Sequence, residues 1–200
     1  STIANLVTRL YETTKGSILF NKTNIKDLNL YSLRSSMGYI PQDGYLFSGT
    51  IKENIAFASD SINEKEILKA AKNTEILEEI ESFTEKFETI IGERGVKLSG
   101  GQRQRLAIAR TFYKKPDVFI FDDCLSAIDA TKEQRILKNL KNASKGKTSI
   151  IISHRITTLK DADYIIVLDK GRIIEEGTHL YLLKRKGFYY EINKSQINSI

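Results

Sequence analysis

Apolar residues recur along this chain with two spacings, one typical of helices and one typical of strands. Over residues 3–10, apolar positions lie three and four residues apart, which predicts a helix. Ile67, Leu68 and Ala71 predict a second helix, and Asn63 is a candidate N-cap residue for it. Helical segments therefore stand both near the start of the chain and in its middle.

Short apolar runs of strand length form the second pattern. They occupy Ser17–Phe20, Gly38–Ile40, Asp117–Phe121, Thr148–Ser153, Tyr164–Asp169 and Arg172–Glu176. The last two runs flank Lys170–Gly171, which predicts a hairpin turn. Helical patterns, of which Gln134–Leu140 is the clearest, separate most of the others.

Strands that are apolar throughout and alternate with helices predict an α/β fold with a parallel sheet covered on both faces. Residues 46–112 depart from this pattern, because they are polar, rich in helix signals and poor in strand signals. We therefore expect a first core part over 1–45, a helical subdomain over 46–112, and a second core part with C-terminal helices over 113–200.

The cysteine count and the net charge exclude or disfavour several classes of site and partner. Cys124 is the only cysteine, which excludes an intramolecular disulfide, disfavours a structural zinc site and favours a reducing compartment. The net charge of +6 would suit nucleic acid or anionic lipid, but the basic residues are dispersed except at Lys184–Lys186. Zinc-finger spacing and aromatic RNA-binding signatures are absent, so we expect no nucleic-acid partner.

Polar residues follow three of the predicted strands: Gln42, the pair Asp122 and Asp123, and His154. Ligands of parallel sheets bind beyond the carboxyl ends of the strands, and a carboxylate there suits Mg²⁺ with phosphate. Taken alone, each of these residues could also have a purely structural role. The aspartates fit a helix N-cap, and the histidine and glutamine fit structural roles in loops.

Leu98–Gln102 reads LSGGQ and is followed by an apolar helix. Ser99 and two glycines leave a row of backbone N–H groups at a helix start, where the helix dipole favours anions. A Ser-capped helix behind a glycine turn also fits this short string.

The order of the motifs resolves these alternatives, because nearly the whole chain resembles the ATP-binding cassette of ABC transporters. The matching strings are LSGGQRQR (signature), VFIFDD (Walker B), SAID at 126–129 (D-loop), ISHR at 152–155 (switch histidine) and YIPQD at 39–43 (Q-loop). The resemblance implies a P-loop NTPase core of the RecA-like type with an inserted α-helical subdomain.

Two further segments resemble the exporter branch of that family, such as one half of a bacterial multidrug, lipid or peptide exporter. They are FSGTIKENIAF over Phe47–Phe57 and GERG over Gly92–Gly95. In exporters the second segment lies where the cassette touches its membrane domain. The resemblance therefore implies a membrane domain, encoded upstream in the same polypeptide, and a place at the cytoplasmic face of the cell membrane.

The resemblance also implies the cofactors ATP and Mg²⁺, a second cassette as partner, and in-line phosphoryl transfer to water. Asp123, His154 and Gln42 would act in catalysis, and Ser1, Gln42 and Asp122 would serve the metal. The remaining nucleotide contacts would come from Ser1, Thr2, Ser99, Gly100, Gly101, Gln102 and Asp129.

Ser1-Thr2 matches the end of a Walker A loop, G-x-x-x-x-G-K-[ST], whose glycines and lysine are not in the sequence. We expect the chain to be truncated inside this motif. Since the lysine and the loop N–H groups neutralise the β- and γ-phosphates, we expect the chain alone to be a poor ATPase.

Asp123 stands where most active cassettes have a glutamate that polarises the attacking water, and it is one methylene shorter. Aspartate here resembles the degenerate half of heterodimeric exporters, which binds nucleotide and turns it over slowly; a working aspartate base is the alternative. The sequence leaves open the transported molecule and the choice between homodimer and heterodimer. A soluble ABC protein of repair or translation is disfavoured by the two exporter-type segments.

Overall fold

The computed structural model describes residues 1–57, 59, 61–92 and 95–198. It divides into two compact units, Ser1–Ile152 and Ser153–Ile200. The predicted boundaries at 45/46 and 112/113 do not coincide with this division, and the predicted domains stay a prediction.

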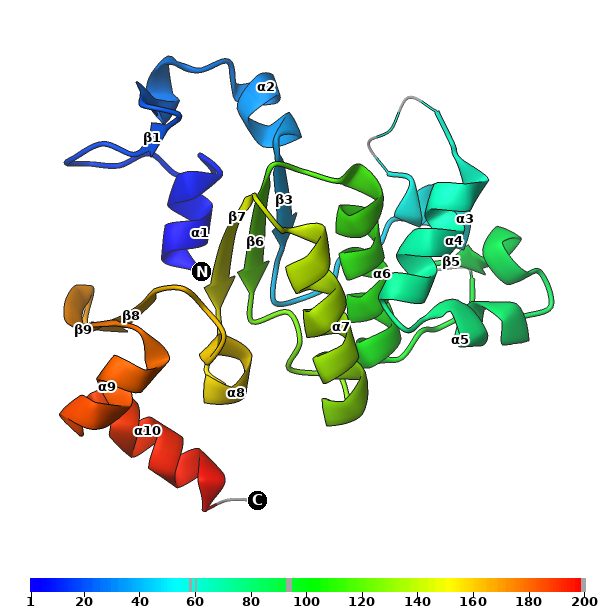
Figure 1. Cartoon of the computed structure of the whole chain (residues 1–200). Coiled ribbons are helices and arrows are strands. Elements are labelled where there is room, and N and C mark those ends of the chain that lie inside the picture. The colour runs from blue at the N-terminus through cyan, green and yellow to red at the C-terminus, as the bar shows by residue number, and fades with distance from the viewer. Residues whose placement is uncertain (58, 60, 93–94, 199–200) are drawn as a thin grey trace. The chain divides into compact units, whose positions relative to one another are not determined.

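The first unit carries most of the helices and its main sheet (Figure 1). Its helices are α1 (Thr2–Val7), α2 (Leu30–Ser35), α3 (Ile51–Ile55), α4 (Glu64–Asn73), α5 (Leu77–Ser82), α6 (Gly100–Lys114), α7 (Ala130–Ala143) and the 3-10 turns η1 (Ile25–Asp27) and η2 (Lys86–Glu88). Its strands are β1 (Leu19–Phe20), β2 (Thr23–Asn24), β3 (Met37–Ile40), β4 (Gly49–Thr50), β5 (Ile90–Ile91), β6 (Val118–Asp122) and β7 (Thr148–Ile152).

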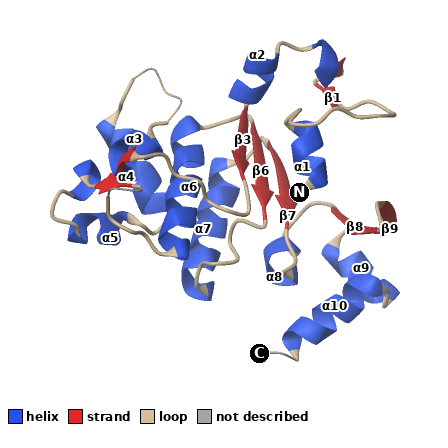
Figure 2. Cartoon of the chain, turned by 180° about the vertical axis from the view of Figure 1, so that it is seen from behind, coloured by secondary structure: helices blue, strands red, loops and turns tan. Residues whose placement is uncertain are grey.

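The main sheet has three parallel strands in the order β3-β6-β7, which confirms the predicted parallel sheet (Figure 2). Strand β6 is buried along its whole length. Its side chains alternate between two apolar clusters: Phe119 and Phe121 pack with α6 and α7, whereas Val118 and Ile120 pack with α1 and α2. Helices therefore cover both faces of the sheet, as a strand without polar positions requires.

The region 46–112 is helical, with only the short β4–β5 pair between its helices. Its helices are amphipathic, and α4 begins after Asn63, whose side chain accepts a hydrogen bond from Glu66 N. Ile51, Ile67 and Ile108 belong to the apolar cluster that also holds Phe119 of the sheet. This region and the sheet thus share one core.

The predicted end of the first helix was wrong. Helix α1 ends at Val7 and not at residue 10, because Arg9 adopts a left-handed backbone with φ of 52°. In that conformation its guanidinium donates to the carbonyl oxygens of Ile25 and Leu28, at 2.9 and 3.0 Å. The helix predicted from Ile67, Leu68 and Ala71 is confirmed as α4, in which Ile67 and Ala71 are buried and Leu68 is exposed.

The second unit contains α8 (Ile156–Leu159), β8 (Ile165–Asp169), β9 (Arg172–Gly177), α9 (His179–Arg185) and α10 (Phe188–Ile197). Strands β8 and β9 form the predicted antiparallel hairpin. Lys170 and Gly171 both have positive φ, of 46° and 76°, as a tight two-residue turn requires. Across the described ranges, no helix is both long and apolar enough to span a bilayer.

Candidate functional site

The carboxyl ends of β3, β6 and β7 lie at one edge of the sheet, because the three strands are parallel. Asp122 is the last residue of β6, opposite Ile152 at the end of β7. Gln42 follows the end of β3 by two residues. This edge therefore holds two of the three predicted strand-end groups. His154 belongs to the second unit, where its side chain is exposed, and its predicted role stays a prediction.

Asp122 is buried at this edge on the face that α1 covers, because β6 alternates in steps of two from Val118. The Ser1 amino group lies 3.3 Å from its Oδ1. Tyr39 of β3 donates its hydroxyl to Asp122 Oδ2 at 3.2 Å. Burial, and secondarily the charge of Asp122, raise the pKa of Tyr39 to about 12, so the phenol stays protonated and keeps donating at neutral pH.

The buried Asp122 carboxylate at this edge fits Mg²⁺, which proteins bind through one or two carboxylates together with phosphate and water oxygens. Ser1, at the start of α1, lies beside this carboxylate, and its nitrogen is 3.3 Å from Asp122 Oδ1. Within the described ranges no three His, Cys, Asp or Glu residues form a cluster that could hold a metal by itself.

Asp123 turns the chain away from β6. Its backbone is left-handed, with φ of 48°, and its N–H donates to Ile152 O at 2.8 Å. Aspartate tolerates this conformation better than most residues. The alternative that this pair caps a helix is wrong, because the next helix, α7, begins at Ala130 and is capped by Asp129.

The signature residues form the start of α6. Ser99 Oγ accepts from Gln102 N at 3.2 Å, and Gln102 Oε1 accepts from Ser99 N at 2.8 Å. This capping box confirms the predicted Ser-capped helix and also leaves the next N–H groups, of Gly100 and Gly101, without intrahelical acceptors. A helix start of this kind retains donors for an anion.

Gly101 also lets the D-loop approach this helix. A Cβ atom at Gly101 would lie 2.9 Å from the carbonyl oxygen of Ala127. Two residues later, Asp129 Oδ1 accepts from Lys132 N at 3.0 Å, and this hydrogen bond lowers the pKa of Asp129. The exposed Asp129 carboxylate is thus ionised and fixed at the first turn of α7.

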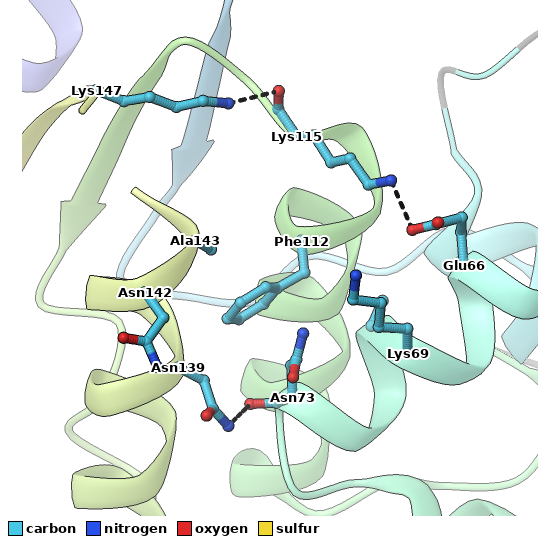
Figure 3. Close-up of a pocket in the computed structure, with 10 residues that line it drawn as sticks. Glu66, Lys69, Asn73, Phe112, Lys115, Asn139, Asn142, Ala143 and Lys147 are labelled. Carbon is cyan, nitrogen blue, oxygen red and sulfur yellow. Dashed lines mark hydrogen bonds and ion pairs between the residues drawn. The ribbon is translucent and has the colours of Figure 1, made fainter. Parts of the chain in front are cut away.

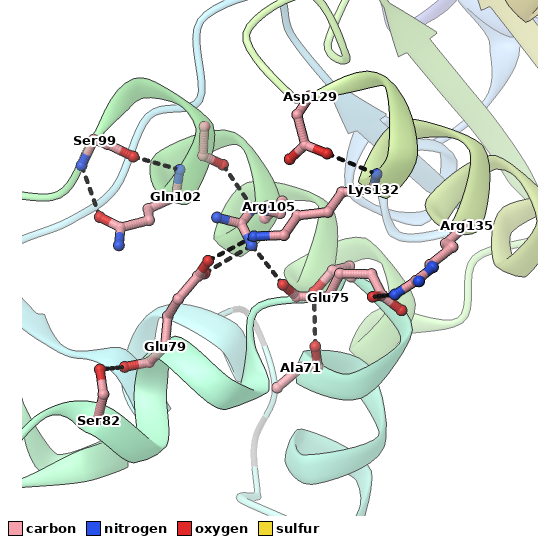
Figure 4. Close-up of polar contacts among 12 residues, drawn as sticks. Ala71, Glu75, Glu79, Ser82, Ser99, Gln102, Arg105, Asp129, Lys132 and Arg135 are labelled. Atoms are coloured by element: carbon pink, nitrogen blue, oxygen red, sulfur yellow. Dashed lines mark hydrogen bonds and ion pairs between the residues drawn. The ribbon is translucent and has the colours of Figure 1, made fainter.

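An ion-pair network joins the signature helix to its neighbours (Figure 4). Arg105 of α6 is buried and lies 2.7 Å from Glu79 Oε2. The other oxygen of Glu79 accepts from Lys132 Nζ of α7 at 2.8 Å. Arg105 also donates to the carbonyl oxygen of Gly101 at 3.2 Å. One carboxylate therefore binds the cations of two helices that carry predicted nucleotide contacts.

We expect Glu79→Gln to lower the free energy of unfolding by about 2 kcal/mol, because it leaves the buried Arg105 without its counter-ion. Glu81→Gln is the matched control, since Glu81 pairs with Lys86 at the surface and such pairs contribute at most about 1 kcal/mol. Urea denaturation measures both. Equal effects would show that the Arg105–Glu79 pair contributes no more than a surface pair.

The two exporter-type segments lie side by side. Gly49 pairs with Ile91 between β4 and β5, and a Cβ at Gly92 would lie 3.0 Å from Ser48 Cα. Phe47 stacks on Phe57 with ring centroids 4.0 Å apart. Of the GERG segment, Glu93 and Arg94 lie outside the described residues.

A pocket of about 400 Å³ opens between α4, α6 and α7 (Figure 3). Lys115 and Lys147, which line it, precede β6 and β7, so the pocket lies at the amino ends of the strands. Lys115 pairs with Glu66 at 2.6 Å, and Lys147 donates to Pro116 O at 2.7 Å. These cations are already engaged, and the pocket lies at the edge opposite Asp122.

The sequence alone indicated no role for Tyr39, Glu79 or Gln104. Tyr39 and Gln104 lie inside the quoted YIPQD and LSGGQRQR strings, so proximity to a motif was the available signal. Glu79 lies in a helix with no motif at all. Cys124 is buried, and burial raises the pKa of its thiol to about 12.

Known proteins resemble this chain over nearly all of its length. The family described as ABC transporter matches residues 1–126. An ATM1-type heavy metal exporter of Novosphingobium aromaticivorans is 44% identical over 96% of the chain, and an ATP-dependent lipid A-core flippase of Syntrophus aciditrophicus is 41% identical over 98%. A solved bacterial Atm1-family ABC exporter with ATP bound superimposes with a TM-score of 0.94 at 43% identity, covering 98% of the chain. The chain spans 32%, 33% and 35% of these proteins, respectively.

Proposed function

Since the chain belongs to the ABC transporter family, as the nucleotide-binding cassette of an exporter, we propose that it binds and hydrolyses Mg·ATP. ATP would lie between the sheet edge of this cassette and the signature of a second one. Closure of the two cassettes would drive export of a substrate through a membrane domain.

One observation carries the proposal: the buried Asp122 carboxylate lies beside the start of α1, at the carboxyl edge of the parallel sheet. Asp122, Ser1 and Gln42 would hold Mg²⁺, which neutralises phosphate charge when bound. Thr2 follows Ser1 at the start of α1 and would contact the phosphates. Asp123 would orient the attacking water.

The signature supports the need for a second cassette. Ser99 caps α6, whereas Asp122 ends β6, and we propose that they contact two different nucleotides. Ser99, Gly100, Gly101 and Gln102 would contact the partner's nucleotide through the start of α6. His154 would contact the γ-phosphate, and Asp129 would lie at the interface of the two cassettes.

The relatives named above are exporters about three times the length of this chain. By analogy, we place this cassette at the cytoplasmic face of a cell membrane, attached to a membrane domain that selects the transported molecule. The adjacent segments around Phe47 and Gly92 are the surface that would receive that domain.

A second candidate function is a cassette that binds nucleotide and hydrolyses it slowly at its own site. Asp123 favours it, because its carboxylate is one methylene shorter than the usual glutamate. A displacement of about 1 Å costs roughly 10²-fold in rate when positioning is the catalytic device. The intact signature would still complete the active site of the partner cassette.

Asp123→Glu tests the proposal in the full-length transporter reconstituted in liposomes. We expect turnover at the site containing this residue to rise about tenfold, because the longer side chain reaches the water. Asp117→Glu is the matched control, an exposed aspartate before β6. Single-turnover hydrolysis provides the measurement.

Asp123→Asn in the same assay separates the two candidates. If it stops hydrolysis and transport, Asp123 is a working base and the slow-site alternative is wrong. If turnover is almost unchanged, this cassette mainly binds nucleotide at its own site.

A further inference from the structure

Gln104 is the one buried glutamine whose side chain bonds to two different loops of the described structure. It lies on α6 and is 7% exposed. Its Nε2 donates to the carbonyl oxygen of Gln42 at 2.9 Å, and its Oε1 accepts from the backbone N–H of Ala127 at 3.2 Å. Because one partner is an acceptor and the other a donor, the two bonds fix the orientation of the amide.

The backbone packs closely around both bonds. A Cβ atom at Gly44 would lie 3.0 Å from Arg103 O, so the loop after β3 rests directly on α6. Ala127 O lies close to Gly101, and Ala127 N is bound to Gln104. One residue of the D-loop, Ala127, is therefore held on both sides by the first turns of the signature helix.

We infer that Gln104 is a positioning residue that makes the Gln42 loop and the D-loop move together with the signature helix. This inference rests on the proposed function, in which the signature serves the partner's nucleotide and the two loops serve the chain's own site. Through this amide and the close backbone packing around it, closure of one nucleotide site would change the position of groups at the other. Buried side chains with both hydrogen-bonding ends engaged favour such a single arrangement over intermediate ones.

Hydrogen–deuterium exchange in the full-length transporter tests the inference. A non-hydrolysable ATP analogue is titrated with Mg²⁺, and protection is followed in three segments: 40–46, 97–104 and 124–130. In the unaltered protein we expect the three segments to gain protection at the same nucleotide concentration. Segments that move together must respond to nucleotide at the same concentration.

Gln104→Met keeps the length of the side chain and removes both hydrogen bonds. In this variant, the nucleotide concentration that gives half-maximal protection should differ between segments. For segments 40–46 and 124–130 we expect it to differ from that of segment 97–104 by roughly fivefold, the factor that one lost hydrogen bond produces. Gln134→Met on the exposed face of α7 is the matched control, and its midpoints should stay coincident. A thermal scan of each variant shows that it is folded.

Gly44→Ala is a second variant, which displaces only the Gln42 loop, because the added methyl group meets α6. Segment 40–46 alone should then separate from the signature. Coincident midpoints in folded Gln104→Met and Gly44→Ala would overturn the inference. Absence of any nucleotide-dependent protection in the unaltered protein would contradict the proposed function, and the inference with it.

Discussion

Replacing Ser99 with arginine is expected to lower ATP turnover by about 10²–10³-fold at the nucleotide site that this signature completes, which is the range for losing a preorganised anion contact. Ser99 is exposed at the start of α6, next to the N–H groups of Gly100 and Gly101. A guanidinium at that position would occupy the space proposed for the phosphates of the partner's nucleotide. It would also remove the Ser99 hydroxyl that accepts from Gln102 N.

Asn63→Arg is the control variant, because it removes a helix N-cap at a position where we expect no contact with nucleotide. Asn63 caps α4 in the same way as Ser99 caps α6, by accepting from the backbone N–H three residues later. Each substitution therefore costs about 1 kcal/mol of stability. Single-turnover hydrolysis in the reconstituted transporter compares the two. Equal turnover in both variants would show that the start of α6 contacts no reacting nucleotide.

Asp122→Asn is expected to lower ATP hydrolysis by about 10²-fold or more at the site of this cassette, because a buried negative charge that attracts Mg²⁺ is lost. The asparagine has the same shape and its carbonyl oxygen still accepts from Tyr39. Loss of charge, and not loss of packing, is therefore the change under test. Phosphate release, followed across a Mg²⁺ titration, measures it.

A second readout of the same variant follows from the raised pKa of Tyr39. Burial is the larger cause of that shift and remains in the variant, whereas the charge of Asp122 is removed. Spectroscopic titration should therefore give Tyr39 a pKa below about 12 but still above its ordinary value. Asp169→Asn, at the exposed end of β8, is the control and should alter neither readout. Normal Mg²⁺ dependence in Asp122→Asn would rule out this carboxylate as a metal ligand.

The sequence by itself determined the features that depend on a few neighbouring residues. The apolar run before Asp122 predicted β6, Asn63 predicted the start of α4, and Lys170–Gly171 predicted the hairpin turn. LSGGQ contained its own capping box, because the donor and acceptor groups lie within three residues. Motif order also indicated the family, which the comparisons confirmed.

Only the tertiary structure decided the features that need two distant segments. Arg9, just after α1, donates to the carbonyl groups of Ile25 and Leu28, and no local pattern carries that information. Tyr39 and Asp122 are separated by 83 residues and meet through the pairing of β3 with β6. Gln104 joins loops that lie 62 residues before it and 23 residues after it. Periodicity and capping report interactions along one element, whereas strand register and packing between elements place these side chains together.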